Sequence, residues 1–201
     1  MAYSSWLTPS KLSGSGNDTV NVSANANNTG RNSRSTSITF SAANCEDVVR
    51  TVVQAGKAET TTIASTATAT KAGGTVTISG TSNSSKLTFT LGTGDLSISL
   101  PASYTAAGNT TTNGAAITGD PGATQEYSFS IVFTVSENTS TSSKSKQVIV
   151  TDNGGHTATC TLTQAAGDAY LTVTPSSVEI PWDGSTSASF SVSSNTNWTV
   201  S

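Results

Sequence analysis

The only histidine of the chain, His156, follows the turn Asp152–Gly155 and is the first candidate for acid–base chemistry. With Asp152 it would supply two members of a Ser-His-Asp triad, in which the carboxylate orients the imidazole and the imidazole accepts a proton from a hydroxyl group. No spacing of a nucleophile and a base is visible in the sequence. We therefore predict an exposed turn histidine and assign no catalytic residue.

The carboxylates and cysteines likewise define no reactive centre. The 12 Asp and Glu residues are scattered, so no pair can be assigned to the acid and nucleophile of a glycosidase. No His/Cys cluster has zinc-binding spacing, no Asp-x-Asp-x-Asp-Gly loop predicts a calcium site, and Gly56-Lys57 lacks the upstream glycine of a phosphate-binding loop. We expect a protein that is not an enzyme and that uses no metal or cofactor.

Aromatic rings are the remaining candidates for ligand contact, because an exposed ring offers a flat apolar face on which a sugar can stack. Trp182 lies in a predicted turn at residues 181–184, and Tyr104 lies in the long connection 101–125. The same connection holds Asp120 in a Gly-Asp-Pro-Gly turn. We predict Tyr104, Trp182 and Asp120 as possible contacts to a glycan or a protein partner.

Composition indicates which elements position these residues. Charged residues make up 10% of the chain, against roughly 25% in an average protein. The 37 threonines and 34 serines favour strands, because the branched Cβ of threonine packs well on a pleated surface while its hydroxyl faces water. No stretch of ten or more residues has apolar positions at helical spacing. The sequence therefore predicts an all-β fold of tandem immunoglobulin-like β-sandwich domains.

The middle segment, residues 58–167, carries the clearest strand pattern. Seven stretches alternate between apolar and polar residues, namely Thr61–Thr70, Thr75–Ser79, Lys86–Leu91, Leu96–Leu100, Glu126–Val135, Gln147–Thr151 and Thr157–Gln164. Seven short strands in about 110 residues are typical of an immunoglobulin-like sandwich. We expect Phe89, Phe129, Ile131 and Phe133 in its core. The connection 101–125 is much longer than the usual roughly two to six residues, which indicates either a contact surface or a disordered loop. We expect a contact loop, in which deletion of Thr105–Ala116 leaves thermal stability nearly unchanged.

The flanking segments are shorter. Residues 1–57 show about three strands, at 19–23, 35–40 and 48–53, too few to close a sandwich. Their last strand ends on Gln54-Ala55-Gly56, as the middle segment ends on Gln164-Ala165-Ala166-Gly167. Cys45 and Cys160 fall in different segments, so we expect no disulfide. Residues 168–201 form the third segment, in which Trp198 follows an alternating strand and is expected in a sandwich core.

Charge excludes some partners. The net charge is -3 and Lys and Arg are scattered singly, so no basic stripe predicts nucleic-acid binding. No apolar stretch is long enough to span a membrane, and the start of the sequence lacks the basic and apolar regions of a signal peptide. If Met1 is the native start, we expect the protein to be made and folded in a cytosol.

The two flanking segments resemble a known family. Leu171–Pro175, Phe190–Val192 and Asn195–Trp198 are similar to the first half of the BACON domain, an immunoglobulin-like module whose name refers to carbohydrate binding in gut Bacteroidetes. Residue Trp6, the glycine-rich stretch 14–17, Arg34-Ser35 and Gln54–Gly56 are similar to its second half. The resemblance covers about residues 3–57 and 169–201, and the halves occur in reverse order.

The resemblance implies two settings. BACON domains occur in tail and head-fibre proteins of crAss-like bacteriophages, which predicts a virion structural protein, a head fibre or capsid-decorating component. Its partners would be capsid or other virion proteins, further copies of itself and possible host or mucin glycans, and it would be assembled in the host cytoplasm. The alternative is a carbohydrate-binding module of a secreted or cell-surface bacterial protein for glycan utilisation, which the missing signal peptide opposes.

Both flanking segments would leave an apolar face uncovered. One explanation is that the natural chain continues past Ser201 and that residues 1–57 are covered by a neighbouring subunit. The other is that residues 169–201 of one chain complete residues 3–57 of the next. The sequence leaves both explanations open.

Overall fold

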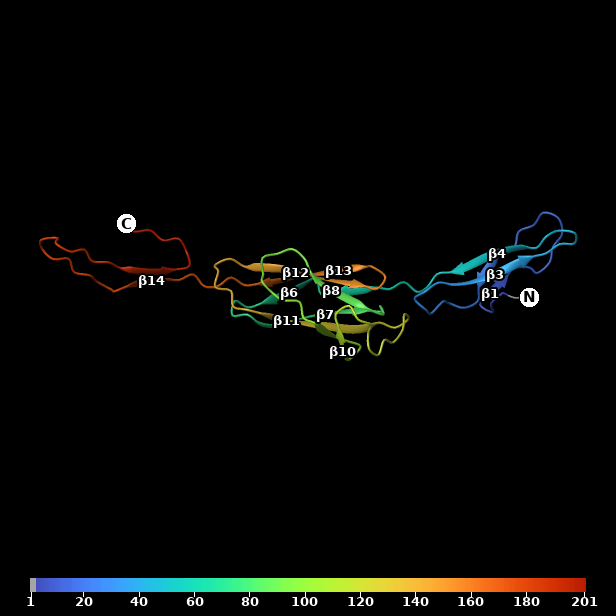
Figure 1. Cartoon of the computed structure of the whole chain (residues 1–201), viewed down its shortest axis with the longest axis horizontal. Coiled ribbons are helices and arrows are strands. Elements are labelled where there is room, and N and C mark those ends of the chain that lie inside the picture. The colour runs from blue at the N-terminus through green and yellow to red at the C-terminus, as the bar shows by residue number, and fades with distance from the viewer. Residues whose placement is uncertain (1–2) are drawn as a thin grey trace.

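The computed structural model describes residues 3–201, and every regular element in that range is a β-strand. The predicted all-β fold is therefore confirmed, while Met1 and Ala2 of the predicted segment 1–57 lie outside the described residues. Figure 1 shows the strands in three groups along one axis, with the N-terminal group in blue at one end and the C-terminal group in red at the other. The middle group is the most extensive.

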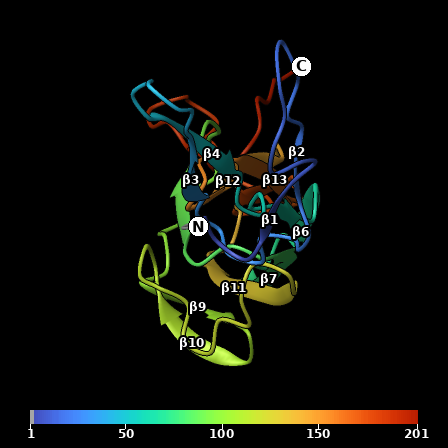
Figure 2. The same cartoon turned by 90° about the vertical axis from the view of Figure 1, so that its right-hand side faces the viewer.

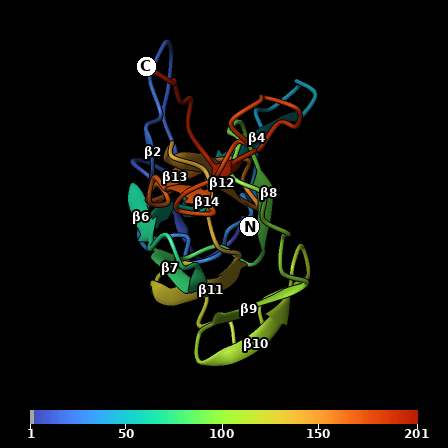
Figure 3. The ribbon, with the colours of Figure 1, turned by 90° about the vertical axis from the view of Figure 1, so that its left-hand side faces the viewer.

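The middle group is a two-layered sandwich. Its strands are β5 (Thr61–Ile63), β6 (Thr66–Ala69), β7 (Gly74–Ser82), β8 (Leu87–Leu91), β9 (Ser103–Ala106), β10 (Asn109–Thr112), β11 (Tyr127–Val135), β12 (Lys144–Asp152) and β13 (Thr157–Gln164). One sheet has the order β10-β9-β11-β7-β5 and the other β6-β13-β12-β8. Figures 2 and 3, which view the molecule from its two ends, show β7 and β11 in one layer and β12 and β13 in the other.

Alternation along β11 builds the core, as predicted. Phe129, Ile131 and Phe133 point inward and are almost completely buried, together with Phe89 on β8 of the opposite sheet. The rings of Phe89 and Phe129 meet edge to face with centroids 5.6 Å apart, which is a favoured aromatic arrangement. Val132, between two of the buried residues, is half exposed on the outer face. The strand period therefore fixes which residues the two sheets bury.

Two predicted strands have a different form. The stretch Thr61–Thr70 divides into β5, which pairs with β7, and β6, which pairs in parallel with β13. The predicted strand Leu96–Leu100 is wrong, because these residues form no ladder. Gly94 adopts a φ of 126°, open to glycine only, where the chain leaves β8. Leu96 is still buried, so its alternation reflected burial and not strand pairing.

The connection 101–125 is part of the scaffold, so the prediction that it is dispensable is wrong, while a contact role for it stays a prediction. Its residues form the hairpin β9–β10, and β9 pairs with β11 at Phe129 and Ser130. The side chain of Asn113 then borders β8, where its Oδ1 accepts from the backbone N–H of Phe89 at 2.7 Å and its Nδ2 donates to the Phe89 carbonyl at 3.0 Å. A segment with this many buried contacts cannot be removed without loss of stability.

The N-terminal group contains two small antiparallel pairs, β1 (Leu7–Pro9) with β2 (Val22–Ala24) and β3 (Arg34–Phe40) with β4 (Val48–Gln54). Leu7 and Ile38 are its buried apolar residues. The guanidinium of Arg34 lies 4.8 Å from the centroid of the Trp6 ring, a cation–π contact that ties the first residues to β3.

The C-terminal group is one antiparallel pair, β14 (Leu171–Thr174) with β15 (Ser191–Ser194). Most of its large apolar side chains are exposed, namely Tyr170, Leu171, Val173, Ile180, Trp182, Phe190, Trp198 and Val200. The expectation that Trp198 lies in a core is therefore wrong within residues 3–201, because the pair forms only one sheet and no second layer covers it. Both cysteines are free, Cys45 at the surface and Cys160 in the sandwich core, where burial raises the pKa of its thiol.

Candidate functional site

The candidate for acid–base chemistry is a structural turn. His156 Nδ1 lies 3.1 Å from Asp152 Oδ2, and the backbone N–H of His156 donates to Asp152 Oδ1 at 2.8 Å. The carboxylate of Asp152 is buried while the imidazole is exposed. No hydrogen bond from a hydroxyl or thiol to His156 is found among residues 3–201. The pair closes the β12–β13 turn, and the prediction of an exposed turn histidine is confirmed.

Tyr104 lies in the core, where the sequence had suggested an exposed loop residue. Its side chain is 4% exposed, its ring meets Phe89 with centroids 4.8 Å apart, and its hydroxyl donates to the Leu87 carbonyl at 3.3 Å. Burial raises the pKa of Tyr104 to about 12. The ring has no free face for a ligand, because β9 belongs to the sandwich sheet. A contact role for Tyr104 stays a prediction that its burial argues against.

Trp182 is the most exposed aromatic residue of the described chain. It is 98% exposed and stands at the tip of the turn between β14 and β15. Two hydrogen bonds hold that turn, from the Gly184 N–H to the Pro181 carbonyl at 2.9 Å and from the Ser185 N–H to Asp183 Oδ1 at 3.0 Å. The indole is thus presented to solvent on a hydrogen-bonded turn, which is the geometry expected of a stacking platform.

Asp120 joins the N-terminal group to the sandwich. Its carboxylate accepts two hydrogen bonds from the Arg31 guanidinium, at 2.7 Å to Nη1 and 2.8 Å to Nη2. Arg31 also donates to the Asn83 carbonyl, and its Nε lies 3.0 Å from Oε1 of the buried Glu59. The guanidinium hydrogen bonds lower the pKa of Asp120 below its ordinary value, and the same pairing raises the pKa of Arg31. We call these four residues the Arg31 junction.

The sequence placed Asp120 in a turn as a possible contact residue and missed its pairing with Arg31. Arg31 and Asp120 are far apart in sequence, and no short motif reports such a pair. The junction uses the charge of Asp120 for a contact within the chain, and this bidentate arrangement is the strong form of such a pair. Asp120 therefore offers little free capacity for a glycan or a partner in this structure.

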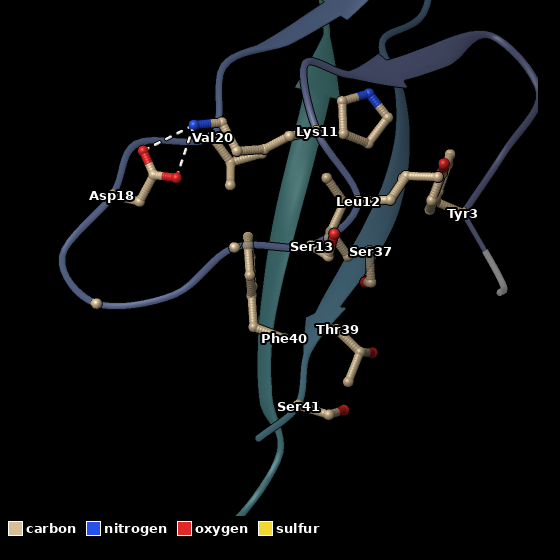
Figure 4. Close-up of a pocket in the computed structure, with 14 residues that line it drawn as sticks. Tyr3, Lys11, Leu12, Ser13, Asp18, Val20, Ser37, Thr39, Phe40 and Ser41 are labelled. Carbon is tan, nitrogen blue, oxygen red and sulfur yellow. Dashed lines mark hydrogen bonds and ion pairs between the residues drawn. The ribbon is translucent and has the colours of Figure 1, made fainter. Parts of the chain in front are cut away.

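A hollow of about 550 Å³ lies in the N-terminal group between β3 and the loop that follows β1. Leu12, Val20, Ile38 and Phe40 line it, and Figure 4 shows Lys11 and Asp18 bridged beside it. The Lys11 ammonium binds both carboxylate oxygens of Asp18 at 2.7 Å, and this hydrogen bond lowers the pKa of Asp18. We call this space the β3 hollow. It combines an apolar floor with one exposed ion pair at its rim.

Residues 3–201 contain no group of three or more His, Cys, Asp or Glu side chains placed to hold a metal ion. Within the same range we find no helix that is long and apolar enough to span a bilayer. The candidate surfaces of the described chain are thus the exposed indole of Trp182, the β3 hollow and the uncovered faces of the two flanking groups.

Comparison with known proteins bears on the N-terminal group. Residues 1–55 match the sequence model of a family described as "BACON: Putative binding domain, N-terminal". The match supports a binding role for this segment, and it confirms the predicted resemblance for the first part of the chain. It does not extend to residues 169–201, whose resemblance stays a prediction. No curated protein matches the chain. What is shown is that this all-β chain begins with a segment similar to the BACON binding domain.

Proposed function

We propose that the chain is a non-enzymatic adhesion protein of a phage virion, a head fibre or capsid-decorating component, and that it contacts glycans through Trp182. The observation that carries the adhesive part is the 98% exposure of Trp182 on a hydrogen-bonded turn. A tryptophan ring held open to water costs free energy that stacking on a sugar would recover. The family match at residues 1–55 supports binding as the general activity.

Glycan binding is tested by comparing Trp182→Ala with the wild-type chain on immobilised mucin O-glycans. Loss of one stacking ring is expected to weaken binding about tenfold or more, since an aromatic contact contributes about 1 kcal/mol beyond its buried area. Tyr170→Ala is the control and should retain binding, because Tyr170 is a half-exposed aromatic residue of the same group that lies just before β14, away from the turn. Equal binding by wild type and Trp182→Ala would remove Trp182 from the proposal.

The virion setting rests on the sequence resemblance and is tested by location. Gold-labelled antibody against the chain should mark the capsid or its fibres in electron micrographs of intact particles. The second candidate function is a carbohydrate-binding module of a secreted bacterial protein, favoured by the family match because its description is that of a binding domain alone. Label on bacterial surfaces or secreted material, and none on particles, would support that second candidate.

A further inference from the structure

The C-terminal group repeats the hydrogen bonds with which the sandwich opens. Three hydrogen bonds of the sandwich have counterparts in the C-terminal group. Asn83 Oδ1 accepts from the Thr60 N–H as Asn195 Oδ1 accepts from the Tyr170 N–H, and Asn83 Nδ2 donates to the Ala58 carbonyl as Asn195 Nδ2 donates to the Asp168 carbonyl. Ser82 Oγ donates to the Thr60 carbonyl as Ser194 Oγ donates to the Tyr170 carbonyl. Strand register agrees, since Ile63 lies opposite Gly80 as Val173 lies opposite Val192. Residues 168–201, the opening half, therefore begin the fold that the sandwich completes.

The N-terminal group repeats the hydrogen bonds with which the sandwich closes. Four hydrogen bonds have counterparts at one constant offset in the numbering. Asn28 Nδ2 donates to the Ala55 carbonyl as Asn138 Nδ2 donates to the Ala165 carbonyl, and the Gly30 N–H donates to Asn28 Oδ1 as the Ser140 N–H donates to Asn138 Oδ1. The Lys57 N–H donates to the Gly30 carbonyl as the Gly167 N–H donates to the Ser140 carbonyl, and Gln54 Nε2 donates to the Ala26 carbonyl as Gln164 Nε2 donates to the Ser136 carbonyl. The pair β3–β4 thus corresponds to β12–β13. Residues 3–57 are the closing half.

The sandwich shows what covers such a closing half. There β8 pairs with the outer edge of β12, and β6 pairs in parallel with the outer edge of β13. Val148 and Val150 of β12 are completely buried in the core between the two sheets. The corresponding residues of β3 are Ile38 and Phe40, and Phe40 remains 43% exposed. Among residues 3–201, β3 and β4 pair only with each other, so both outer edges are free.

The β3 hollow is the counterpart of the sandwich core. Its lining contains Ile38 and Phe40, which correspond to the core residues Val148 and Val150 of the sandwich. In the opening half, the register places Phe190 where Ile78 lies in the sandwich. Ile78 is 1% exposed and Phe190 is 50% exposed. The closing half therefore has an unfilled apolar hollow, and the opening half has an exposed apolar side chain, Phe190, at a position that is buried in the sandwich.

The net charges of the two flanking segments favour pairing of an opening half with a closing half. Residues 168–201 contain Asp168, Glu179 and Asp183 and no Lys or Arg. Residues 1–57 contain five Lys or Arg and three Asp or Glu. Opposite net charges attract the two halves, and equal net charges would oppose the pairing of two opening halves. The partner that fits the closing half by fold, by missing core and by charge is therefore an opening half.

We propose that the opening half of one copy docks on the closing half of a second copy, so that two chains together complete a sandwich. The pairing of β6 with β13 in the sandwich predicts the register of the contact between the two copies. The Gly184 turn matches the Gly73 turn, because each glycine N–H donates to the carbonyl three residues earlier. Copying the β6–β13 pairing then places Val178 opposite Val52 and Ile180 opposite Gln54 of the second copy. The contact is heterologous and repeats from chain to chain as a fibre or ring.

The first test measures association of the 201-residue chain by sedimentation over a range of concentrations. Wild type should form oligomers whose size rises with concentration and falls with added salt. Phe190→Asp should weaken association about 10- to 100-fold, because a fully buried phenylalanine is lost from the joint core. Ser189→Asp is the matched control, since it adds the same charge one residue away on the opposite face and should retain most of the association.

Three outcomes overturn the proposal. A chain that sediments as a monomer at every concentration shows no complementary contact. Equal effects of Phe190→Asp and Ser189→Asp show that charge alone governs association. A mass well above 20.3 kDa for the protein isolated from its native source shows that a longer chain covers these faces itself. Thermal unfolding of the sandwich serves as the folding check, because Ser189 and Phe190 lie outside it.

A second test examines the register. In a Cys45→Ser background, Val53→Cys combined with Glu179→Cys introduces cysteines at the positions that correspond to the paired residues Thr163 and Thr68. Oxidation should give a ladder of disulfide-linked oligomers, and mixing the two single variants should give dimers only. Val53→Cys with Ser185→Cys is the control and should give no ladder. A ladder from the control, or none from the test pair, would exclude this register. Glycan binding is measured separately with Trp182→Ala, so failure of either proposal leaves the other to be judged.

Discussion

At the scale of single residues, the Arg31 junction is a partly buried contact whose energetics depend on pH. Asp120 has a pKa lowered from 3.8 by the Arg31 hydrogen bonds. A carboxyl with a lowered folded pKa stabilises the protein above its unfolded pKa, and this contribution is lost as the pH falls through the folded value. The stabilisation is therefore present at neutral pH and disappears in acid below that value.

We expect Asp120→Asn to lower the free energy of unfolding by about 1–3 kcal/mol at pH 7, because a charge-assisted bidentate pair is replaced by a neutral amide. Urea unfolding at pH 7 and in acid below 3.8 measures the effect, and the difference from wild type should shrink in acid. Arg31→Lys keeps the charge but not the bidentate geometry and should lose a similar amount. A difference between wild type and Asp120→Asn that stays constant with pH would argue against this account.

At the scale of elements, the hairpin β9–β10 explains how the edge strand β8 is held. Asn113, just after β10, hydrogen-bonds both backbone groups of Phe89 with its side-chain amide and so takes the place of a neighbouring strand residue. Edge strands need such partners, since unpaired backbone groups near the core are costly. The connection that looked like a loop thus completes one edge of the core.

Asn113→Ala should lower the free energy of unfolding by about 1–3 kcal/mol, since it leaves two backbone groups of Phe89 without partners. Asn109→Ala removes an amide from the same hairpin whose hydrogen bonds to the Ala107 and Thr118 carbonyls are exposed, and should cost less than about 1 kcal/mol. Chemical denaturation of the two variants provides the comparison. Equal losses would mean that the amide of Asn113 does not support β8.

At the scale of the whole molecule, the chain contains one complete sandwich between two halves of the same design. The sandwich holds the continuous core of the described residues, with Phe89, Phe129, Ile131 and Phe133 among its members. We expect residues 58–167 alone to fold and to unfold in one cooperative transition. This boundary is a prediction that the isolated segment tests directly.

Within that segment, Phe129→Ala should cost about 3–5 kcal/mol, since it leaves a cavity in the centre of β11. Val132→Ala on the half-exposed outer face of the same strand should cost about 1 kcal/mol or less. Calorimetry of both variants gives the comparison. A loss below about 1 kcal/mol for Phe129→Ala would mean that the register of β11 is wrong.

The sequence by itself determined the fold class and most strands, because alternation of apolar and polar residues is a local property of the chain. It placed Phe129, Ile131 and Phe133 correctly in the core for that reason. Local pattern also identified the shared ending at Gln54 and Gln164, whose hydrogen bonds prove equivalent. It missed the shared opening, because Asn83 and Asn195 are single residues whose equivalence lies in the bonds that they make.

Only the tertiary structure decided how distant residues meet. Arg31 and Asp120 pair across two segments, and burial of Tyr104 depends on where β9 docks. Leu96–Leu100 alternate like a strand but lie against the core without strand partners. A sequence records which residues seek burial, whereas the partners that bury them are fixed by long-range packing. For the same reason, only the structure showed that the hydrogen bonds of the two flanking groups repeat those of the sandwich.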